Sequence, residues 1–199
     1  TADRLRHALN AHVDEGVVVE RAETCRDDFH ARFDARSKRY AYVVATSRFR
    51  PPIGRAHAHW VSWPLDLEPM RAAASILRGQ HDFKAFGNTG SPRATTVRTL
   101  HHLRIVARRR GFAIVAQADG FLYNMVRNLV GTLLDVGRGK LALTDVERAL
   151  ATGDRDAAGP TAPACGLYLL SVRYPEVLFR GPDAHGAGAP GLFDGGSRR

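Results

Sequence analysis

Residues 39–45 read Arg-Tyr-Ala-Tyr-Val-Val-Ala, which is the strongest strand signal in this 199-residue chain. The run places aromatic and β-branched side chains at neighbouring positions, so a strand formed here is apolar on both faces. Strands of that kind are typical of the middle of a covered sheet. We therefore expect a central strand at this point, with helices packed on the sheet.

The segments downstream of this strand predict further strands and a first helix. A short strand is expected at 60–63, followed by a helix that begins after the N-cap Asp66 and stops near Gly79. Two alternating runs, 100–107 and 112–118, are joined at Arg110-Gly111 and indicate an antiparallel hairpin.

Two more helices and a last strand are expected towards the C-terminus. Residues 122–136 have strong helical periodicity. Thr144 and Glu147 have the spacing of a capping box, which predicts a shorter helix ending at Leu150. A strand at 167–174 completes the pattern. Hairpins without regular strand–helix alternation favour an α+β fold, with a mostly antiparallel sheet and helices on one face.

The helix at 122–136 has one apolar arc, and Arg127 lies at the edge of it. An arginine at that boundary can deliver its guanidinium into a cleft, where a carboxylate or phosphate would bind it. The side chain can instead lie on the surface with its guanidinium in water, and the wheel alone favours this second interpretation. The far side of the wheel holds Asn124, Asn128, Gly131 and Asp135.

The two ends of the chain differ in composition from its middle. Residues 1–12 read as a helix, and Val17-Val18-Val19 reads as a short strand. We expect 1–24 to be the end of an N-terminal domain and 25–180 to form one C-terminal domain. Residues 181–199 are rich in Gly and Pro and poor in apolar side chains, so we expect a disordered tail.

The charge of the chain indicates a polyanionic partner. Lys and Arg number 29 against 20 Asp and Glu, a net charge of +9 with a pI near 10.3, so nucleic acid is favoured ahead of anionic lipid. No apolar run approaches the roughly 18 residues of a membrane helix, and no signal peptide pattern is present. These features predict a cytoplasmic protein that does not enter membranes.

Several enzyme classes lose support because their motifs are missing. The sequence has no phosphate-binding loop, dinucleotide fingerprint, zinc-protease helix or nucleophile elbow. The two cysteines, Cys25 and Cys165, lie far apart, and the histidines have no matching carboxylate or thiol. No metal site is expected.

Basic residues cluster around the central strand. Beside Tyr40 and Tyr42 they predict a surface that binds phosphates and offers rings for stacking, although a solvated basic face would read the same way. Of two further arginines, one lies within the polar loop at 87–96 and the other just after it. The candidate RNA-binding residues are Arg32, Arg36, Lys38, Arg39, Arg93 and Arg98.

Taken together, these segments resemble the tRNA pseudouridine synthase A family. The similarity runs from about Leu5 to Pro175, and its most specific part is Gly-Phe-Leu-Tyr-Asn-Met-Val-Arg-Asn-Leu-Val-Gly at 120–131. The other matching stretches, in the family's order, are 28–33, 37–42, 79–86, 159–163 and 166–169.

The resemblance implies a fold, a reaction and roles for individual residues. Family members isomerise uridine in the tRNA anticodon arm, need no cofactor, act as homodimers and consist of two ferredoxin-like halves with a cleft between them. Carried over to this chain, Tyr40 is the aromatic residue that contacts the substrate, and Arg127 is the arginine that orients the catalytic carboxylate. Leu167 and Leu169 are expected to line the pocket.

The sequence departs from the family at the nucleophile. The family's catalytic Asp lies in a Gly-Arg-Thr-Asp motif upstream of the part that this chain matches, and the chain contains no such motif. We therefore expect the C-terminal part of an enzyme, inactive alone, in which Arg127 faces solvent or RNA phosphate. The alternative is a non-catalytic RNA-binding module.

Overall fold

The computed structural model describes residues 1–52, 54–88 and 95–175, and these form two compact units. Among the described residues, unit 1 holds 1–35 with 174 and 175, and unit 2 holds 36–173. The domain boundaries expected from the sequence stay predictions. The expected tail at 181–199 lies outside the described residues.

Unit 1 contains the helix α1 (Ala2–Asn10) followed by turns and extended segments. The predicted strand at 17–19 is wrong, because a strand needs the backbone of another strand and Val19 is bonded instead to a side chain. The Asn10 amide donates to the Val19 carbonyl at 2.9 Å and accepts from the Val19 N–H at 2.7 Å. Later in the unit, Tyr174 donates to the Ala31 carbonyl at 2.8 Å.

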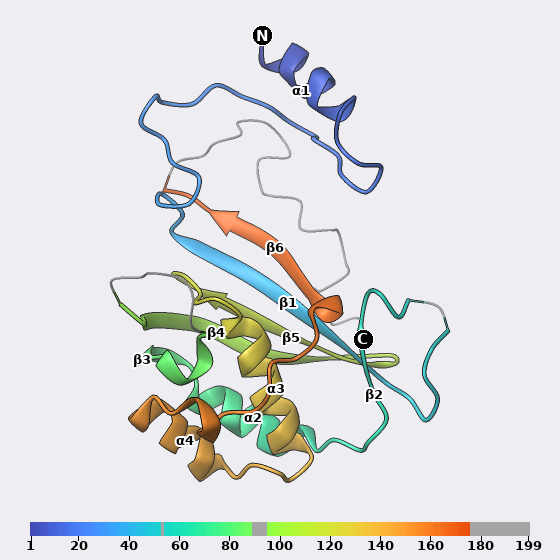
Figure 1. Ribbon diagram of the computed structural model, residues 1–199, viewed down its shortest axis with the longest axis vertical. Helices are drawn as coiled ribbons and strands as arrows, with labels where there is room; N and C mark the ends of the chain where they lie inside the picture. Colours follow the sequence, from blue (N-terminus) through green and yellow to red (C-terminus); the bar gives the residue numbers. More distant parts are fainter. Residues whose placement is uncertain (53, 89–94, 176–199) are drawn as a thin grey trace, which may run out of the picture. The chain divides into compact units, whose positions relative to one another are not determined.

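Unit 2 is built on a six-stranded sheet in the order β2-β1-β5-β4-β3, with β6 also paired to β1 (Figure 1). β1 is central, as predicted: β5 lies antiparallel along one edge, while β6 and the parallel β2 share the other. The strands are β1 (Ser37–Thr46), β2 (His59–Val61), β3 (Gly79–Asp82), β4 (Val97–Arg108), β5 (Gly111–Ala118) and β6 (Leu167–Arg173).

The predicted hairpin is confirmed as β4 and β5, which turn at Arg109 and Arg110. Gly111 begins β5 with a φ of +136°, which is in the range that L side chains rarely adopt. A Cβ at Gly111 would lie 2.1 Å from the Val44 carbonyl oxygen. Glycine at this position therefore lets the hairpin approach β1 closely enough to pair with it.

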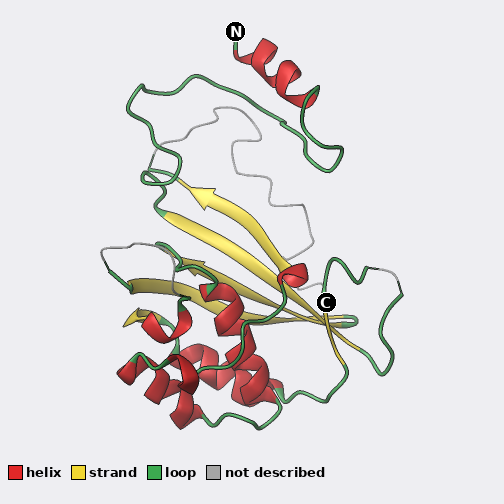
Figure 2. Cartoon of the chain, in the orientation of Figure 1, coloured by secondary structure: helices red, strands yellow, loops and turns green. Residues whose placement is uncertain are grey.

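The helices α2 (Leu67–Ile76), α3 (Met125–Gly137) and α4 (Leu143–Thr152) cover one face of the sheet (Figure 2). This confirms the α+β class with a mostly antiparallel sheet. Asp66 caps α2 as predicted and accepts from the Glu68 N–H at 3.0 Å. The core lies between helices and sheet, and its largest fully buried side chains include Tyr42, Met70, Phe83, Phe86, Leu129 and Leu133.

Two helix starts differ from the prediction. α3 begins at Met125 rather than at residue 122, because Asn124 has a φ of +58° and cannot continue a right-handed helix. α4 begins at Leu143, and Asp145 accepts from the Ala142 N–H at 2.8 Å. The Thr144 capping box is therefore wrong, because the N-cap is Ala142, two residues before Thr144, and Asp145 bonds its N–H in place of Glu147.

Among the residues described, none of the helices has the length and apolar character needed to cross a membrane.

Candidate active site around Arg127

A later segment covers part of the polar side of α3. Residues 158–162, which we call the strap, cross it, and both Asn128 and Thr132 have no exposed surface. A Cβ at Gly131 would lie only 1.7 Å from the Pro160 carbonyl oxygen. The helical wheel considers one helix alone, so it does not reveal a cover that a later segment contributes.

Arg127 is half-buried and is held by the end of the strap. Its Nε donates to the Ala162 carbonyl at 2.6 Å, and its main-chain carbonyl accepts from the Ala162 N–H at 3.1 Å. Its Nη1 donates to the Asn124 side chain at 3.1 Å. The protein itself thus binds two of the guanidinium nitrogens, which the expectation of an arginine that faces solvent or RNA phosphate did not include.

Arg127 forms no ion pair with any carboxylate in the described part of the chain. Three acidic residues of unit 2 bind backbone groups elsewhere. Asp66 caps α2, Asp82 accepts from the Lys84 N–H, and both oxygens of Asp119 accept from the Thr99 N–H at 3.1 Å. Each of the three thus satisfies a backbone donor at the end of a helix or strand.

Tyr40 lies on the face of β1 that the helices cover. Its ring makes an edge-to-face contact with Phe121, with centroids 5.1 Å apart, and it is paired across the strands with Leu169 of β6. Burial raises the pKa of Tyr40. Leu169 is 54% exposed, whereas Leu167 is half-buried and packs against the core. The structure thus brings Tyr40, Phe121 and Leu169 together as an apolar patch.

Tyr42 has a different role from the one expected. Its side chain is fully buried, so it cannot stack on an RNA base, and its hydroxyl donates to the Pro163 carbonyl at 2.6 Å. Burial is the main cause that raises the pKa of Tyr42 well above its ordinary value, and the nearby Arg127 acts in the opposite direction. Tyr42 therefore ties β1 to the segment that follows the strap.

The residues that contact Arg127 and Tyr40 were not identified from the sequence. Asn124, Phe121 and Ala162 each lie within a matched family stretch, but no local pattern distinguishes them. One signal was available for Asn124: asparagine tolerates a left-handed backbone better than most residues, and here it directly precedes a helix.

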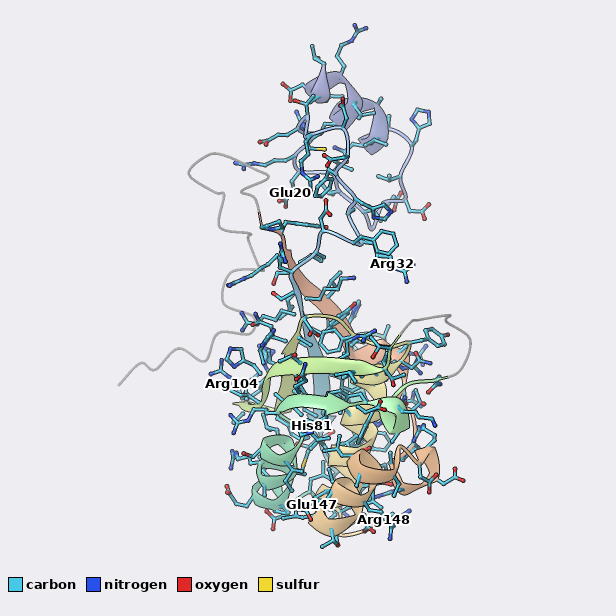
Figure 3. The ribbon with its side chains drawn as sticks, turned by 90° about the vertical axis from the view of Figure 1, so that its left-hand side faces the viewer. Glu20, Arg32, His81, Arg104, Glu147 and Arg148 are labelled. Atoms are coloured by element: carbon cyan, nitrogen blue, oxygen red, sulfur yellow. The ribbon has the colours of Figure 1, made fainter. Side chains whose placement is uncertain are left out.

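The predicted RNA-binding residues are divided between the two units. Arg32 is in unit 1, where its guanidinium lies 5.6 Å from the Phe33 ring centre (Figure 3). In unit 2, Arg36 precedes β1 and Lys38 belongs to it. Arg98 of β4 is half-buried and donates to the carbonyls of Thr95 and Val97. Arg93 lies outside the described residues.

Arg39 of β1 belongs to a basic group whose other members lie on β4 and just before β3. The pKa of His102 on β4 is lowered, first by desolvation and then by the positive charges of Arg104, His101, Arg39 and Arg78. Arg104 is labelled on its strand in Figure 3. In the described ranges there is no group of three or more His, Cys, Asp or Glu side chains that could bind a metal.

Comparison with known proteins gives the same family for this chain. A family model described as tRNA pseudouridine synthase matches residues 73–175. The tRNA pseudouridine synthase A of Thermoanaerobacter pseudethanolicus is 43% identical over 173 residues, which cover 87% of this chain and 71% of the relative. That of Bordetella petrii is 41% identical over 180 residues, covering 90% and 67%. The matched residues contain α3, the strap and β6, so the chain belongs to the tRNA pseudouridine synthase A family.

Proposed function

We propose that this chain is part of an enzyme that isomerises uridine to pseudouridine in the anticodon arm of tRNA. The observation that carries the proposal is the half-buried guanidinium of Arg127, which the strap holds on the covered face of the sheet. Tyr40 and Leu169 supply an apolar surface on that same face. We further propose that the enzyme acts as a homodimer and needs no cofactor, as the family resemblance implies.

The reaction exchanges one glycosidic bond for another. The bond between N1 of uracil and C1′ of ribose breaks, the base turns, and C5 forms a new bond to C1′. The proton on C5 is lost and N1 gains a proton, so the product is an isomer of the substrate. The target base must leave its stack, and we assign Tyr40 to pack against it. Leu167 and Leu169 exclude water from the detached base.

The reaction also needs a positioned carboxylate, which attacks the sugar or removes a proton from it. We propose that this group comes from outside residues 1–199, in a Gly-Arg-Thr-Asp motif. Two facts support this: the sequence has no such motif, and Asp66, Asp82 and Asp119 bind backbone N–H groups. Arg127 would then orient that carboxylate and keep it ionised.

For tRNA binding we propose contacts to phosphates rather than to bases. The group comprises Arg32, Arg36, Lys38, Arg39, Arg93 and Arg98.

A tritium-release assay tests the enzyme proposal. The substrate is a tRNA transcript carrying 5-tritiated uridine, because the exchange of N1 for C5 at C1′ releases the label. The 199-residue chain is expected to release no tritium above background, and the same chain extended upstream through a Gly-Arg-Thr-Asp motif is expected to release it at every target uridine. Release by the 199-residue chain alone would show that one of its own residues is the nucleophile.

The extended protein also distinguishes the enzyme from an RNA-binding module. If it binds tRNA but releases no label, the non-catalytic alternative is correct. Its Asp→Asn variant at the motif is the matched control, since it keeps the fold and the contacts to RNA while it removes the carboxylate.

The role of Tyr40 is tested by two substitutions in the extended protein. Tyr40→Phe keeps the ring and is expected to bind tRNA almost normally. Tyr40→Ala is expected to lose a base contact of about 1–3 kcal/mol, measured as tRNA affinity by filter binding. Equal affinity and turnover of the Phe and Ala variants would show that Tyr40 is a packing residue beside Phe121.

A further inference from the structure

A buried polar centre lies directly beside Arg127. Asn128 is fully buried, yet every hydrogen-bonding position of its amide is used. Its Nδ2 donates to the Phe86 carbonyl at 2.7 Å and to the Asn88 side chain at 2.8 Å. Its Oδ1 accepts from the Thr161 hydroxyl at 2.6 Å and from Arg155 Nη2 at 3.2 Å. Asn128 therefore joins three segments that are far apart in the sequence.

Hydrogen bonds also hold the strap along its length. The Thr132 hydroxyl accepts from the Gly159 N–H at 2.9 Å and donates to the Asn128 carbonyl at 2.9 Å. Arg155 Nη1 donates to the Gly159 carbonyl at 2.7 Å. Because these bonds are directional, they set the position of the strap along α3 more sharply than apolar contacts would.

The strap and α3 are connected by two adjacent side-chain bonds. Asn128 follows Arg127 on the helix, and Thr161 precedes Ala162 on the strap. The hydroxyl of Thr161 donates to Asn128 Oδ1 at 2.6 Å, and the carbonyl of Ala162 accepts from Arg127 Nε at 2.6 Å. The first bond therefore holds the strap one residue before the acceptor for the guanidinium, and it acts together with the bond from the Ala162 N–H to the Arg127 carbonyl.

We infer that Asn128 and Thr161 are positioning residues that set the direction of the Arg127 guanidinium through the Ala162 carbonyl. The inference about geometry stands on this network, and its consequence for turnover rests on the proposed role of Arg127. Because Nε is bound to Ala162 and Nη1 to Asn124, the plane of the guanidinium is fixed, and two-point binding of a carboxylate requires a fixed plane.

The test uses the side-chain signal of Arg127 in the 199-residue chain, so it does not depend on activity. Chains labelled with ¹⁵N-arginine are compared by the rate at which the Arg127 Nε–H exchanges with water, and the signal is identified by its loss in Arg127→Lys. Thr161→Val removes the hydroxyl and is expected to speed this exchange about tenfold, the factor that corresponds to one lost hydrogen bond. Thr161→Ser keeps the hydroxyl and is expected to restore slow exchange.

Two further variants exclude trivial explanations. Thr161→Ala removes the same hydroxyl without placing a methyl group there, so a packing defect caused by valine does not decide the result. Thr152→Val is the matched control, since the Thr152 hydroxyl bonds the Arg148 carbonyl and the Asp154 N–H and makes no hydrogen bond to the strap in the described structure. An Arg127 exchange rate that stays within twofold in both Thr161→Val and Thr161→Ala would overturn the inference.

Turnover is then measured in the extended enzyme to separate the inference from the proposed function. Thr161→Val is expected to lower kcat about tenfold with little change in KM for tRNA, and Thr161→Ser is expected to recover it. Faster exchange of the Arg127 N–H with unchanged kcat would confirm the positioning network and reject the catalytic role of Arg127. Unchanged exchange would reject the network whatever the turnover.

Discussion

The Gly131→Ala variant is expected to lose about 3 kcal/mol or more of unfolding free energy, through overpacking and the loss of buried hydrogen bonds. The new Cβ would lie 1.7 Å from the Pro160 carbonyl oxygen and 2.9 Å from its carbon. The atom in the way is backbone, so the strap must move. That movement breaks the bonds of Gly159 to Thr132 and of Ala162 to Arg127.

Helix propensity alone predicts that Gly131→Ala raises the free energy of unfolding, so the two arguments predict opposite results for this variant. Replacing a glycine by alanine inside a helix stabilises it by about 1 kcal/mol when space is available. Urea unfolding of the 199-residue chain measures the difference. Gly16→Ala is the control, because a Cβ at Gly16 has no atom within 4 Å, and its effect is expected to stay within about 0.5 kcal/mol. A stabilised Gly131→Ala chain would show that the strap does not lie against α3.

Replacing Arg127 by methionine in the extended enzyme is expected to lower kcat by about two to three orders of magnitude, the usual cost of removing one preorganised charged or hydrogen-bonding group from a catalytic site. Methionine keeps much of the volume but cannot orient a carboxylate. The affinity for tRNA is expected to change less than kcat, because the guanidinium is bonded to Ala162 and Asn124 rather than extended into solvent.

Two comparisons separate catalysis from stability at Arg127. Arg127→Lys keeps the charge but not the planar fork, so its kcat is expected to fall between those of arginine and methionine. Arg138→Met is the matched control, since Arg138 caps the other end of α3, pairs with Asp135 at 2.8 Å and lies over Trp63. If both methionine variants lose turnover equally, the loss reflects α3 as a whole and the assignment of Arg127 is rejected.

Most strands and helices of unit 2 follow from local patterns, although β3 (Gly79–Asp82) was not predicted. The predicted strand at 39–45 lies within β1, because aromatic, β-branched and small apolar side chains in this order suit a covered sheet. The hairpin of β4 and β5 and the cap of α2 were predictable for the same kind of reason, since alternation and an N-cap aspartate act over a few residues.

Predictions failed where a contact came from a distant segment. Val17-Val18-Val19 has the composition of a strand but pairs with no other strand, and the Asn10 side chain bonds the Val19 backbone instead. Tyr42 looked like a ring for stacking, yet the segment after the strap covers it and receives its hydroxyl. The deciding partner is nine residues from Val19 and 121 residues from Tyr42, and in neither case does the pattern that predicted the element contain it.

The sequence by itself determined the family, the α+β class and the presence of one arginine at the edge of an apolar helix face. Only the tertiary structure decided what that arginine contacts, because the strap, some 30 residues later in the chain, buries Asn128 and brings the Ala162 carbonyl to Arg127. Hydrophobic periodicity shows which face of a helix is apolar and which is polar when the helix is considered alone. This periodicity cannot predict that another segment will supply a backbone carbonyl, and here the Ala162 carbonyl binds the arginine of the candidate site.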